Sequence, residues 1–424
     1  MKTIQLTLDQ EQAFLNLKEN RRNLFITGGA GTGKSFLIQY FLRSQVEKIP
    51  VLASTGAAAI IVGGRTFHSF FGLGRMQGGP EQVFTEALKN KRLKKRLNQV
   101  SRLIIDEISM ISFDTLDVAE KIARALRAND EPWGGLRIVA VGDFAQLPPV
   151  SQSRSKEWAF LGEAWAASEF KILHLTEVMR TEDTDFMAVL SDLRYGKSSV
   201  RLKHFLKTHT RQEVDGDVTR LFPRRDQTEA FNLGRLAEIP EISRRYETIY
   251  SGEQRYLERV QRDAPIPAVL ELKKGALVMI RVNDSKQRYV NGTTGRVIAL
   301  KDEVVTIETD RRTLEIEPFT YSVQNEDGQE VAFAKNFPLN LAYASTIHKI
   351  QGATLDKVHI DLLGLWEPGQ AYVALSRARR GDDVTISRWS ERSILADPMV
   401  KSFYGIEVEV PISEEYFSEE FNQV

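Results

Sequence analysis

From Asn23 to about Lys171, short apolar runs alternate along the chain with amphipathic stretches. The runs "NLFITG", "VLAS", "LIID" and "RIVAVGD" are apolar at successive positions, so each predicted strand would be covered on both faces. The stretch "KSFLIQYFLRS" has the apolar spacing of a helix instead. This alternation predicts a parallel sheet with helices packed on its two faces.

A second pattern of the same kind surrounds "TRLFPRRDQTEAFN" and resumes at "LAYASTIH", "KVHIDLL" and "VTISR". Between its two parts the chain carries "GALVMIRV", "TGRVIAL", "EVVTIET" and "TLEIEPF", which are short β-rich runs separated by Gly, Asn and Asp turns. We therefore expect a second α/β unit that is interrupted by a small β-barrel.

The composition limits the number of domains and the classes of site that the chain can contain. A chain of 424 residues with 42% hydrophobic and 27% charged residues is long enough for about two to four domains with buried cores. The 57 basic residues balance the 57 acidic ones, which still allows a basic groove on one face. The absence of cysteine excludes disulfides, zinc–thiolate sites and cysteine nucleophiles. The first residues lack the apolar core of a signal peptide, and "VLASTGAAAIIVGG" is too short and too polar to span a bilayer, so we expect a cytoplasmic protein without membrane contact.

The stretch "GGAGTGKS" follows a predicted strand and opens a predicted helix. Glycines allow successive backbone N–H groups to point at phosphates, and the helix N-terminus adds partial positive charge. Lys34 would supply a cation to the β- and γ-phosphates and Ser35 an oxygen to Mg²⁺. All positions match a phosphate loop, so this interpretation is preferred to a glycine turn that only caps a helix. The predicted phosphate-binding residues are Gly29, Ala30, Gly31, Thr32, Gly33, Lys34 and Ser35.

Two further stretches complete a nucleotide site. "LIIDE" ends a buried strand with two carboxylates: Asp106 is placed to hold Mg²⁺ and Glu107 to orient or deprotonate the attacking water. "GDFAQLPPV" follows the next strand, and its Gln146 is a neutral group that can contact the γ-phosphate or its water. The sequence thus predicts hydrolysis of a nucleoside triphosphate, with ATP as the expected nucleotide and Mg²⁺ as the metal.

A phosphoryl-transfer transition state spreads negative charge, and an arginine from another domain can stabilise it. Arg180 in "LTEVMRT" and Arg377 in "QAYVALSRAR" are the two candidates, and we expect Arg377 near a helix start. Taken alone, each arginine would more often be an ordinary surface or ion-paired residue.

The motifs "GGAGTGKS", "IDEISMI", "GDFAQLPPV", "LTEVMRT", "LAYASTIHKIQG" and "YVALSRAR" occur in the order typical of superfamily 1 helicases. "DTLDVAEKIARALR" and "GGRTFHSFFGLG" resemble signature stretches of the petite-integration-frequency (Pif) helicases, of bacterial or phage type. The resemblance extends from Leu6 to about Arg380.

This resemblance implies α/β architecture with two RecA-like domains and ATP between them. The first domain would span 1–175 with a short DNA-facing insertion at about 64–89. The second would comprise 176–237 and 337–405, with an SH3-like β-barrel inserted at 238–336, and 406–424 would be an acidic C-terminal tail. The resemblance also implies that Gln10 contacts adenine, that Arg180 and Arg377 contact the γ-phosphate, and that the backbone of Gly352 senses the nucleotide.

The resemblance also gives a role to "TIHKIQGATLD", which places His, Lys, Gln and Gly together between apolar segments. In this family the corresponding loop lies between nucleotide and single-stranded DNA. Thr346 and His348 would face DNA and Gln351 and Gly352 the ATP, while Lys349 could serve either ligand.

Other DNA-facing candidates are less distinct. Thr55, Thr66 and His68 could bind phosphates, whereas Asn291 could contact DNA or only form a hairpin turn. The phenylalanines Phe67, Phe70 and Phe71 could stack on bases or belong to the core. The basic stretch Leu88 to Arg102, with apolar Leu93, Leu97 and Val100, could bind DNA or form a helix with a solvated basic face.

The resemblance implies an ATP-dependent helicase that moves 5′ to 3′ on single-stranded DNA and unwinds duplex, with G-quadruplex unwinding as a further family activity. Roles in DNA repair, replication and recombination would follow. Expected partners are single-stranded and duplex or forked DNA, and single-strand-binding or replication proteins, for a monomeric motor associated with the nucleoid. Alternatives are a translocase that displaces proteins but unwinds poorly, a RecD-like subunit of a larger complex, and a DNA-binding module with a relict ATP site.

Overall fold

The structure is a computed structural model that describes residues 6–19, 21–54, 58, 59, 64–74, 76, 78–149, 156–179, 181, 183–212, 214, 218–284, 288–310, 312–324 and 329–406. Thr55 and Arg180 lie outside these residues, as does the predicted acidic tail from 407 onward.

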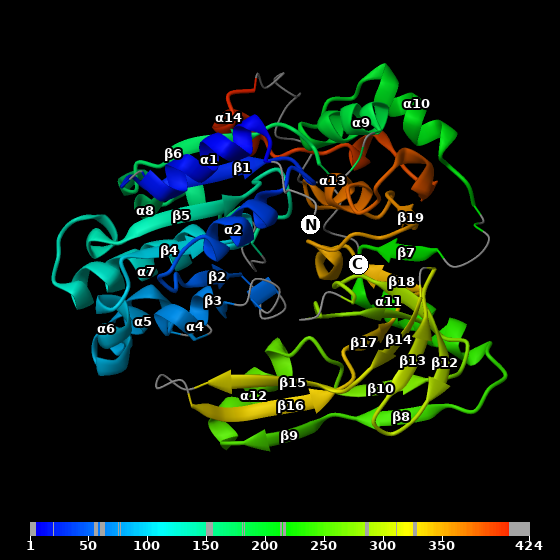
Figure 1. The fold of residues 1–424 in the computed structure, drawn as a ribbon. Helices are drawn as coiled ribbons and strands as arrows, with labels where there is room; N and C mark the ends of the chain where they lie inside the picture. The colour runs from blue at the N-terminus through cyan, green and yellow to red at the C-terminus, as the bar shows by residue number, and fades with distance from the viewer. Residues whose placement is uncertain are drawn as a thin grey trace.

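The first α/β unit is built on a six-stranded sheet whose strands all pair in parallel, in the order β3-β2-β4-β5-β1-β6 (Figure 1). Its strands are β1 (Leu24–Gly28), β2 (Val51–Ala53), β3 (Arg65–Thr66), β4 (Arg102–Ile105), β5 (Arg137–Gly142) and β6 (Lys171–Leu175). Parallel strands end at one edge in the same direction, so the loops after β1, β4 and β5 are brought together. These loops carry the predicted phosphate loop, carboxylates and glutamine.

Both faces of this sheet are buried, as its uninterrupted apolar runs predict. Leu24 and Ile26 of β1 belong to one core and Phe25 between them to another, because successive strand residues point to opposite faces. The first core includes α1 (Leu8–Glu19) and α2 (Lys34–Arg43). The second core includes α4 (Phe67–Phe71), α5 (Gly79–Leu88), α6 (Lys91–Asn98), α7 (Phe113–Arg127) and α8 (Glu163–Ala167), with the short helices η1 (Ile108–Met110), η2 (Pro132–Gly135) and η3 (Ala159–Leu161) nearby.

The second α/β unit has a parallel four-stranded sheet of order β18-β7-β19-β20. Its elements are α9 (Thr184–Arg194), α10 (Val200–Thr208), β7 (Thr219–Phe222), α11 (Arg225–Ala237), β18 (Ala344–Thr346), η4 (His348–Ile350), β19 (Val358–Asp361), α13 (Gln370–Leu375), η5 (Gly381–Asp383), β20 (Val384–Arg388), η6 (Glu391–Ser393) and α14 (Pro398–Phe403). Helix α14 returns to the first unit, where Val400 joins the second core and Phe403 stacks on Phe160 with ring centres 4.5 Å apart. Helix α14 therefore connects the two units by packing against the first.

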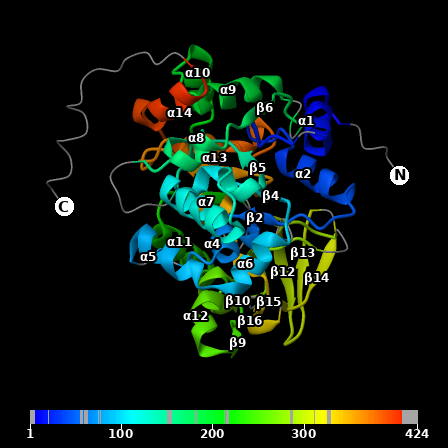
Figure 2. The ribbon, with the colours of Figure 1, turned by 90° about the vertical axis from the view of Figure 1, so that its left-hand side faces the viewer.

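The segment between β7 and β18 contains mainly antiparallel strands, which lie at one end of the two α/β units in both views (Figures 1 and 2). A five-stranded sheet of order β14-β13-β12-β11-β17 adjoins a three-stranded sheet, β15-β16-β9, and the pair β10-β8. The elements are β8 (Arg244–Glu247), β9 (Ile249–Gly252), α12 (Gln254–Asp263), β10 (Val269–Leu272), β11 (Leu277–Ile280), β12 (Thr294–Leu300), β13 (Val305–Glu308), β14 (Thr313–Ile316), β15 (Phe319–Gln324), β16 (Glu330–Asn336) and β17 (Leu339–Leu341).

None of the helices in the described part of the chain is both long and apolar enough to cross a membrane.

Candidate nucleotide and DNA site

The loop between β1 and α2 has the backbone of a phosphate cradle. Gly31 and Gly33 have φ angles of 83° and 81°, a left-handed region that glycine adopts without strain. The Lys34 ammonium donates to the carbonyl oxygens of Gly28 and Gly29 at 2.7 and 2.9 Å. Removal from water lowers the pKa of Lys34, and neighbouring carboxylates act in the opposite direction. The lysine is therefore held within the loop, as a phosphate-binding cation must be.

The two carboxylates after β4 lie at the same edge of the sheet. The N–H of Glu107 donates to Asp106 Oδ1 at 3.0 Å, and Asp106 is only 6% exposed. Burial and the Glu107 charge raise the pKa of Asp106 to about 7. Glu107 has a φ of 52°, which is uncommon for a residue with a side chain. Such strain is often found at functional positions, because a fixed side-chain direction compensates for its cost.

The loop that begins at Thr346 reaches this site from the second sheet. Its Gln351 Nε2 donates to Glu107 Oε2 at 3.2 Å and lies 3.4 Å from Gln146 Oε1. Gly352 follows with a φ of 80°. One amide from the second unit therefore contacts two of the groups predicted to act on the γ-phosphate and its water, Glu107 and Gln146.

Arg377 lies beneath this loop. It is 2% exposed and donates to the carbonyls of Ile350 and Ala353 at 3.4 and 3.1 Å, and to that of Val373 at 2.8 Å. The expected position near a helix start is wrong: α13 begins at Gln370, and Arg377 follows its C-terminal end. In this conformation Arg377 stabilises the loop through these hydrogen bonds. Its contact with the γ-phosphate stays a prediction.

Arg180 lies outside the described residues, but Met179 before it contacts the phosphate loop. The N–H of Met179 donates to the carbonyl oxygen of Gly31 at 2.8 Å, so the segment after β6 touches the phosphate loop. Gln10 touches the same loop from α1, where its Nε2 donates to the Thr32 carbonyl oxygen at 3.1 Å and it is 2% exposed. An adenine contact by Gln10 stays a prediction.

A buried polar network next to the phosphate loop was not predicted. Asp143, the second residue of "GDFAQLPPV", is fully buried and accepts from Arg194 of α9, with Nη2 to Oδ1 at 2.9 Å. Tyr372 of α13 donates to Asp143 Oδ2 at 3.2 Å, and its hydroxyl oxygen accepts from the N–H of Ala30 at 2.6 Å. A tyrosine of the second unit therefore contacts an amide of the phosphate loop.

Tyr404, at the C-terminal end of α14, completes this network. Its hydroxyl lies 2.9 Å from Thr27 Oγ1 and accepts from the N–H of Phe144 at 3.1 Å. Burial alone would raise the pKa of Asp143, but the charges of Arg194 and Lys34 hold it below its usual value. Asp143 therefore stays ionised and accepts hydrogen bonds from Arg194 of α9, Tyr372 of α13 and Tyr404, the last at 3.4 Å. Only "GD" marked this position in the sequence, and nothing marked Arg194.

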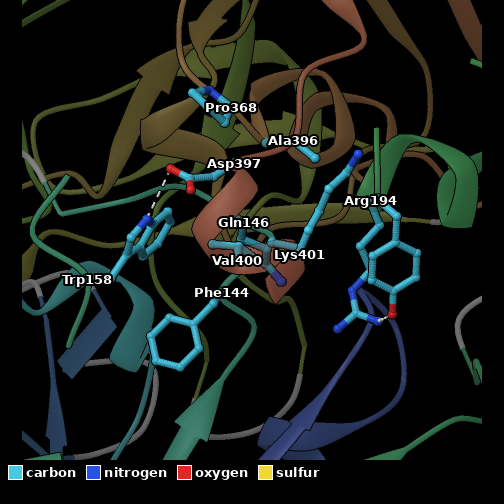
Figure 3. Close-up of a pocket in the computed structure, with 12 residues that line it drawn as sticks. Phe144, Gln146, Trp158, Arg194, Pro368, Ala396, Asp397, Val400 and Lys401 are labelled. Atoms are coloured by element: carbon cyan, nitrogen blue, oxygen red, sulfur yellow. Dashed lines mark hydrogen bonds between the residues drawn. The ribbon is translucent and has the colours of Figure 1, made fainter. Parts of the chain in front are cut away.

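Figure 3 shows a pocket that Arg194 of this network also lines, with Trp158 and Asp397 joined by a hydrogen bond in its lining. The indole N–H of Trp158 donates to Asp397 Oδ2 at 3.1 Å, and both side chains are buried. Val400 of α14 and Gln146 also line the pocket. It is therefore part of the seam between the two units and not the phosphate cradle.

The predicted DNA-facing residues occupy different environments. Thr66 caps α4 by accepting from the N–H of Ser69 at 3.2 Å, and His68 is half-buried in the same helix. Thr346 is only 7% exposed, whereas His348 is half-buried, and burial lowers the pKa of His348. Asn291 is half-buried in the turn before β12. DNA contact by these residues stays a prediction, and for Thr346 it would require movement of the loop.

Burial decides between the two interpretations of the phenylalanines, but not between those of the basic stretch. Phe67, Phe70 and Phe71 are at most 2% exposed, so they belong to the core and offer no ring face to a base. On α6, Leu93 and Leu97 are fully buried, while Lys91, Arg92, Lys94 and Lys95 are exposed. The basic stretch therefore forms an amphipathic helix with an exposed basic face, and DNA contact by that face stays a prediction.

A phosphate loop, paired carboxylates and a second parallel sheet that reaches the same site define a two-domain nucleotide-dependent protein. The sequence profile of the PIF1-like helicase family matches residues 5–201. The ATP-dependent DNA helicase Pif1 of Bdellovibrio bacteriovorus is 47% identical over 404 residues, which cover 95% of this chain and 92% of that protein. The PIF1 helicase of Xenopus laevis is 36% identical over 94% of this chain, which spans 64% of the Xenopus protein. The chain therefore belongs to the PIF1-like helicase family.

Solved structures support the same assignment. Bacteroides Pif1 in complex with ADP-AlF4 has a TM-score of 0.81 and 29% identity, covering 95% of this chain and 97% of the other. Bacteroides Pif1 bound to single-stranded DNA has a TM-score of 0.69 with the same identity and coverage. The predicted fold class is confirmed: two RecA-like domains, a small insertion in the first and an SH3-like β-barrel insertion in the second. The arrangement of this chain resembles the form without DNA more closely.

Proposed function

We propose that this protein is an ATP- and Mg²⁺-dependent DNA helicase that moves 5′ to 3′ on single-stranded DNA and unwinds duplex. The observation that carries the proposal is the hydrogen bond from Gln351 to Glu107, which links the second RecA-like domain to the hydrolytic carboxylate of the first. A loop that contacts the nucleotide site and continues toward His348 can couple hydrolysis to grip on a strand. The names of the relatives, all ATP-dependent DNA helicases, support the same activity.

The residues of the first domain fit a magnesium–nucleotide complex. Ser35 is exposed at the start of α2, and the raised pKa of Asp106 shows a buried carboxylate whose charge lacks compensation. The described residues contain no group of three metal-binding side chains, so nucleotide oxygens and water would complete the coordination. When bound, the metal neutralises charge on the β- and γ-phosphates.

Each predicted residue has a role in this proposal. Lys34 and the loop amides hold the phosphates, while Glu107 orients the attacking water and Gln146 contacts it. Arg180 and Arg377 approach the γ-phosphate when the domains close, and Gly352 follows that movement. Thr55, Thr66, His68, Asn291, Thr346 and His348 contact DNA.

The lower similarity to the DNA-bound Bacteroides form supports a rearrangement of domains when DNA binds. We further propose the domain limits 1–175, 176–237 with 337–405, and 238–336, a monomeric motor, and a location at the nucleoid. Single-strand-binding or replication proteins are its proposed protein partners.

Strand separation on three substrates tests direction and activity together: a duplex with a 5′ tail, one with a 3′ tail and a blunt one, each with ATP and Mg²⁺. Only the 5′-tailed duplex should open, and Lys34→Ala should abolish opening because the phosphates lose their cation. Opening of the 3′-tailed duplex would contradict the direction. If none opened while DNA still stimulated ATPase, the protein would be a translocase; without any ATPase, a DNA-binding module.

Gln351→Ala tests the coupling between the domains. We expect DNA-stimulated ATPase to fall about five-fold, because one net hydrogen bond contributes about 1 kcal/mol, while ATPase without DNA changes little. Steady-state ATPase with and without oligo-dT measures both rates, and Gln99→Ala at an exposed position serves as the control. An equal loss of both rates would assign Gln351 to hydrolysis itself.

A further inference from the structure

Arg281 is a buried cation for which the described residues provide no acidic partner. It follows β11 in the inserted barrel and is 8% exposed. Its Nη2 donates to the carbonyl oxygen of Lys349 at 3.1 Å, and its Nη1 lies 3.8 Å from Met279 Sδ. Burial lowers the pKa of Arg281, and no charge among the described residues opposes this effect. A buried charge without a counter-ion is costly, so the position calls for an explanation.

Two more cations lie close to it. Lys349 lies on η4, where part of its side chain is exposed to solvent. Partial removal from water lowers its pKa, and the charges of Arg225 and Arg281 lower it further. Among the described residues, Glu229 acts on Lys349 in the opposite direction, but it already forms an ion pair with Arg225 Nε at 2.5 Å. Three cations and one acid therefore share this place, and their mutual repulsion favours the binding of an anion.

The cluster lies where the second RecA-like domain meets the barrel. Lys349 follows β18 and Arg225 begins α11, which follows β7, so both lie at the edge where the parallel strands end. Among the described residues no side chain caps the first turn of α11, so its N–H groups and positive end lie at the same edge, where Asp226 is exposed to solvent. A Cβ at Gly292 of the barrel would lie 3.2 Å from Ala353 Cβ, so the barrel packs on the same loop.

We propose that Arg281, Lys349 and Arg225 form a binding site for a backbone phosphate of DNA at the seam between the second RecA-like domain and the barrel. The inference rests on the proposed function and adds three residues to its DNA contacts. Because Arg281 is as buried as Thr346, its contact with a phosphate includes the same movement of the loop. The nucleotide is the less suitable anion, because Gln351, two residues after Lys349, is the group that turns to the ATP site. A phosphate bound here would fix the barrel and the loop that begins at Thr346 to the same point of the DNA strand.

Arg281→Met keeps the apolar length of the side chain and removes its charge. We expect affinity for oligo-dT to fall about ten-fold, because a hydrogen bond to a charged group contributes more than a neutral one. In a titration of KCl, the slope of log affinity against log salt should decrease by about 0.7, the value for one phosphate contact on a single strand. The midpoint of thermal unfolding should be unchanged or higher, since a costly buried charge is removed.

A control variant and a measurement of ADP binding distinguish the possible outcomes. Lys207→Met, an exposed lysine on α10 away from the barrel, should leave affinity and stability unchanged. An unchanged salt slope in Arg281→Met, or weaker binding of ADP with unchanged binding of DNA, would overturn the inference. Failure of the unaltered protein to bind oligo-dT would instead overturn the proposed function.

Discussion

Replacing Glu107 by glutamine is expected to reduce the ATPase rate by about 10²- to 10⁴-fold, the usual contribution of a general base. The amide has the same shape but cannot accept a proton, and Gln351 can still approach it. Nucleotide affinity should change little, because Lys34 and the amides of the phosphate loop hold the phosphates. Single-turnover hydrolysis and binding of a fluorescent ADP analogue measure the two effects separately.

Glu81→Gln on the exposed face of α5 is the matched control and should retain full activity. A Glu107→Gln protein with nearly normal ATPase would show that another group activates the water. Equal losses of hydrolysis and nucleotide binding would instead place Glu107 among the residues that hold the nucleotide.

Replacing Arg194 by methionine is expected to lower the free energy of unfolding by about 3–5 kcal/mol, because it leaves a buried carboxylate without its partner. Arg194 and Asp143 are 12% and 0% exposed at their side chains, so water cannot replace the lost ion pair. The midpoint of urea unfolding measures the loss. Lys203→Met removes an exposed ion pair with Glu391 and should cost less than about 1 kcal/mol.

The double variant Arg194→Met with Asp143→Asn tests the cause of this loss. An amide at 143 removes the unpaired charge, so part of the lost stability should return. No recovery would mean that Arg194 stabilises the protein through packing on Tyr404, whose ring lies 5.1 Å from the guanidinium. The pKa of Asp143 is depressed in the folded state, so its contribution is present at neutral pH and is lost as pH falls through that pKa.

The nucleotide site shows how much of function the sequence already contains. Gly28 to Ser35 form a contiguous loop whose glycines, lysine and helix start act together, and the structure forms that loop between β1 and α2 as predicted. Glu107 was assigned from its place after an apolar strand. In both cases the required partners are adjacent in sequence, so local pattern is enough.

The amphipathic pattern predicted the structure only where the pattern had a single structural interpretation. The phenylalanines of "TFHSFF" could be core or surface, because helical spacing does not tell which face is covered, and the structure buries all three. Arg377 was expected near a helix start, but α13 begins seven residues earlier, at Gln370 after the left-handed Gly369. Helix limits depend on such backbone angles, which the residue types suggest but do not fix.

By itself the sequence determined the α/β units, the inserted barrel, the phosphate loop and the family. The tertiary structure alone decided that Arg194 would pair with Asp143, that Tyr372 would contact the phosphate loop and that Arg281 would meet Lys349. These partners are 51, 342 and 68 residues apart. Contacts of that range depend on how whole domains pack, and each one involves a buried polar group whose low-dielectric surroundings make the choice of partner decisive.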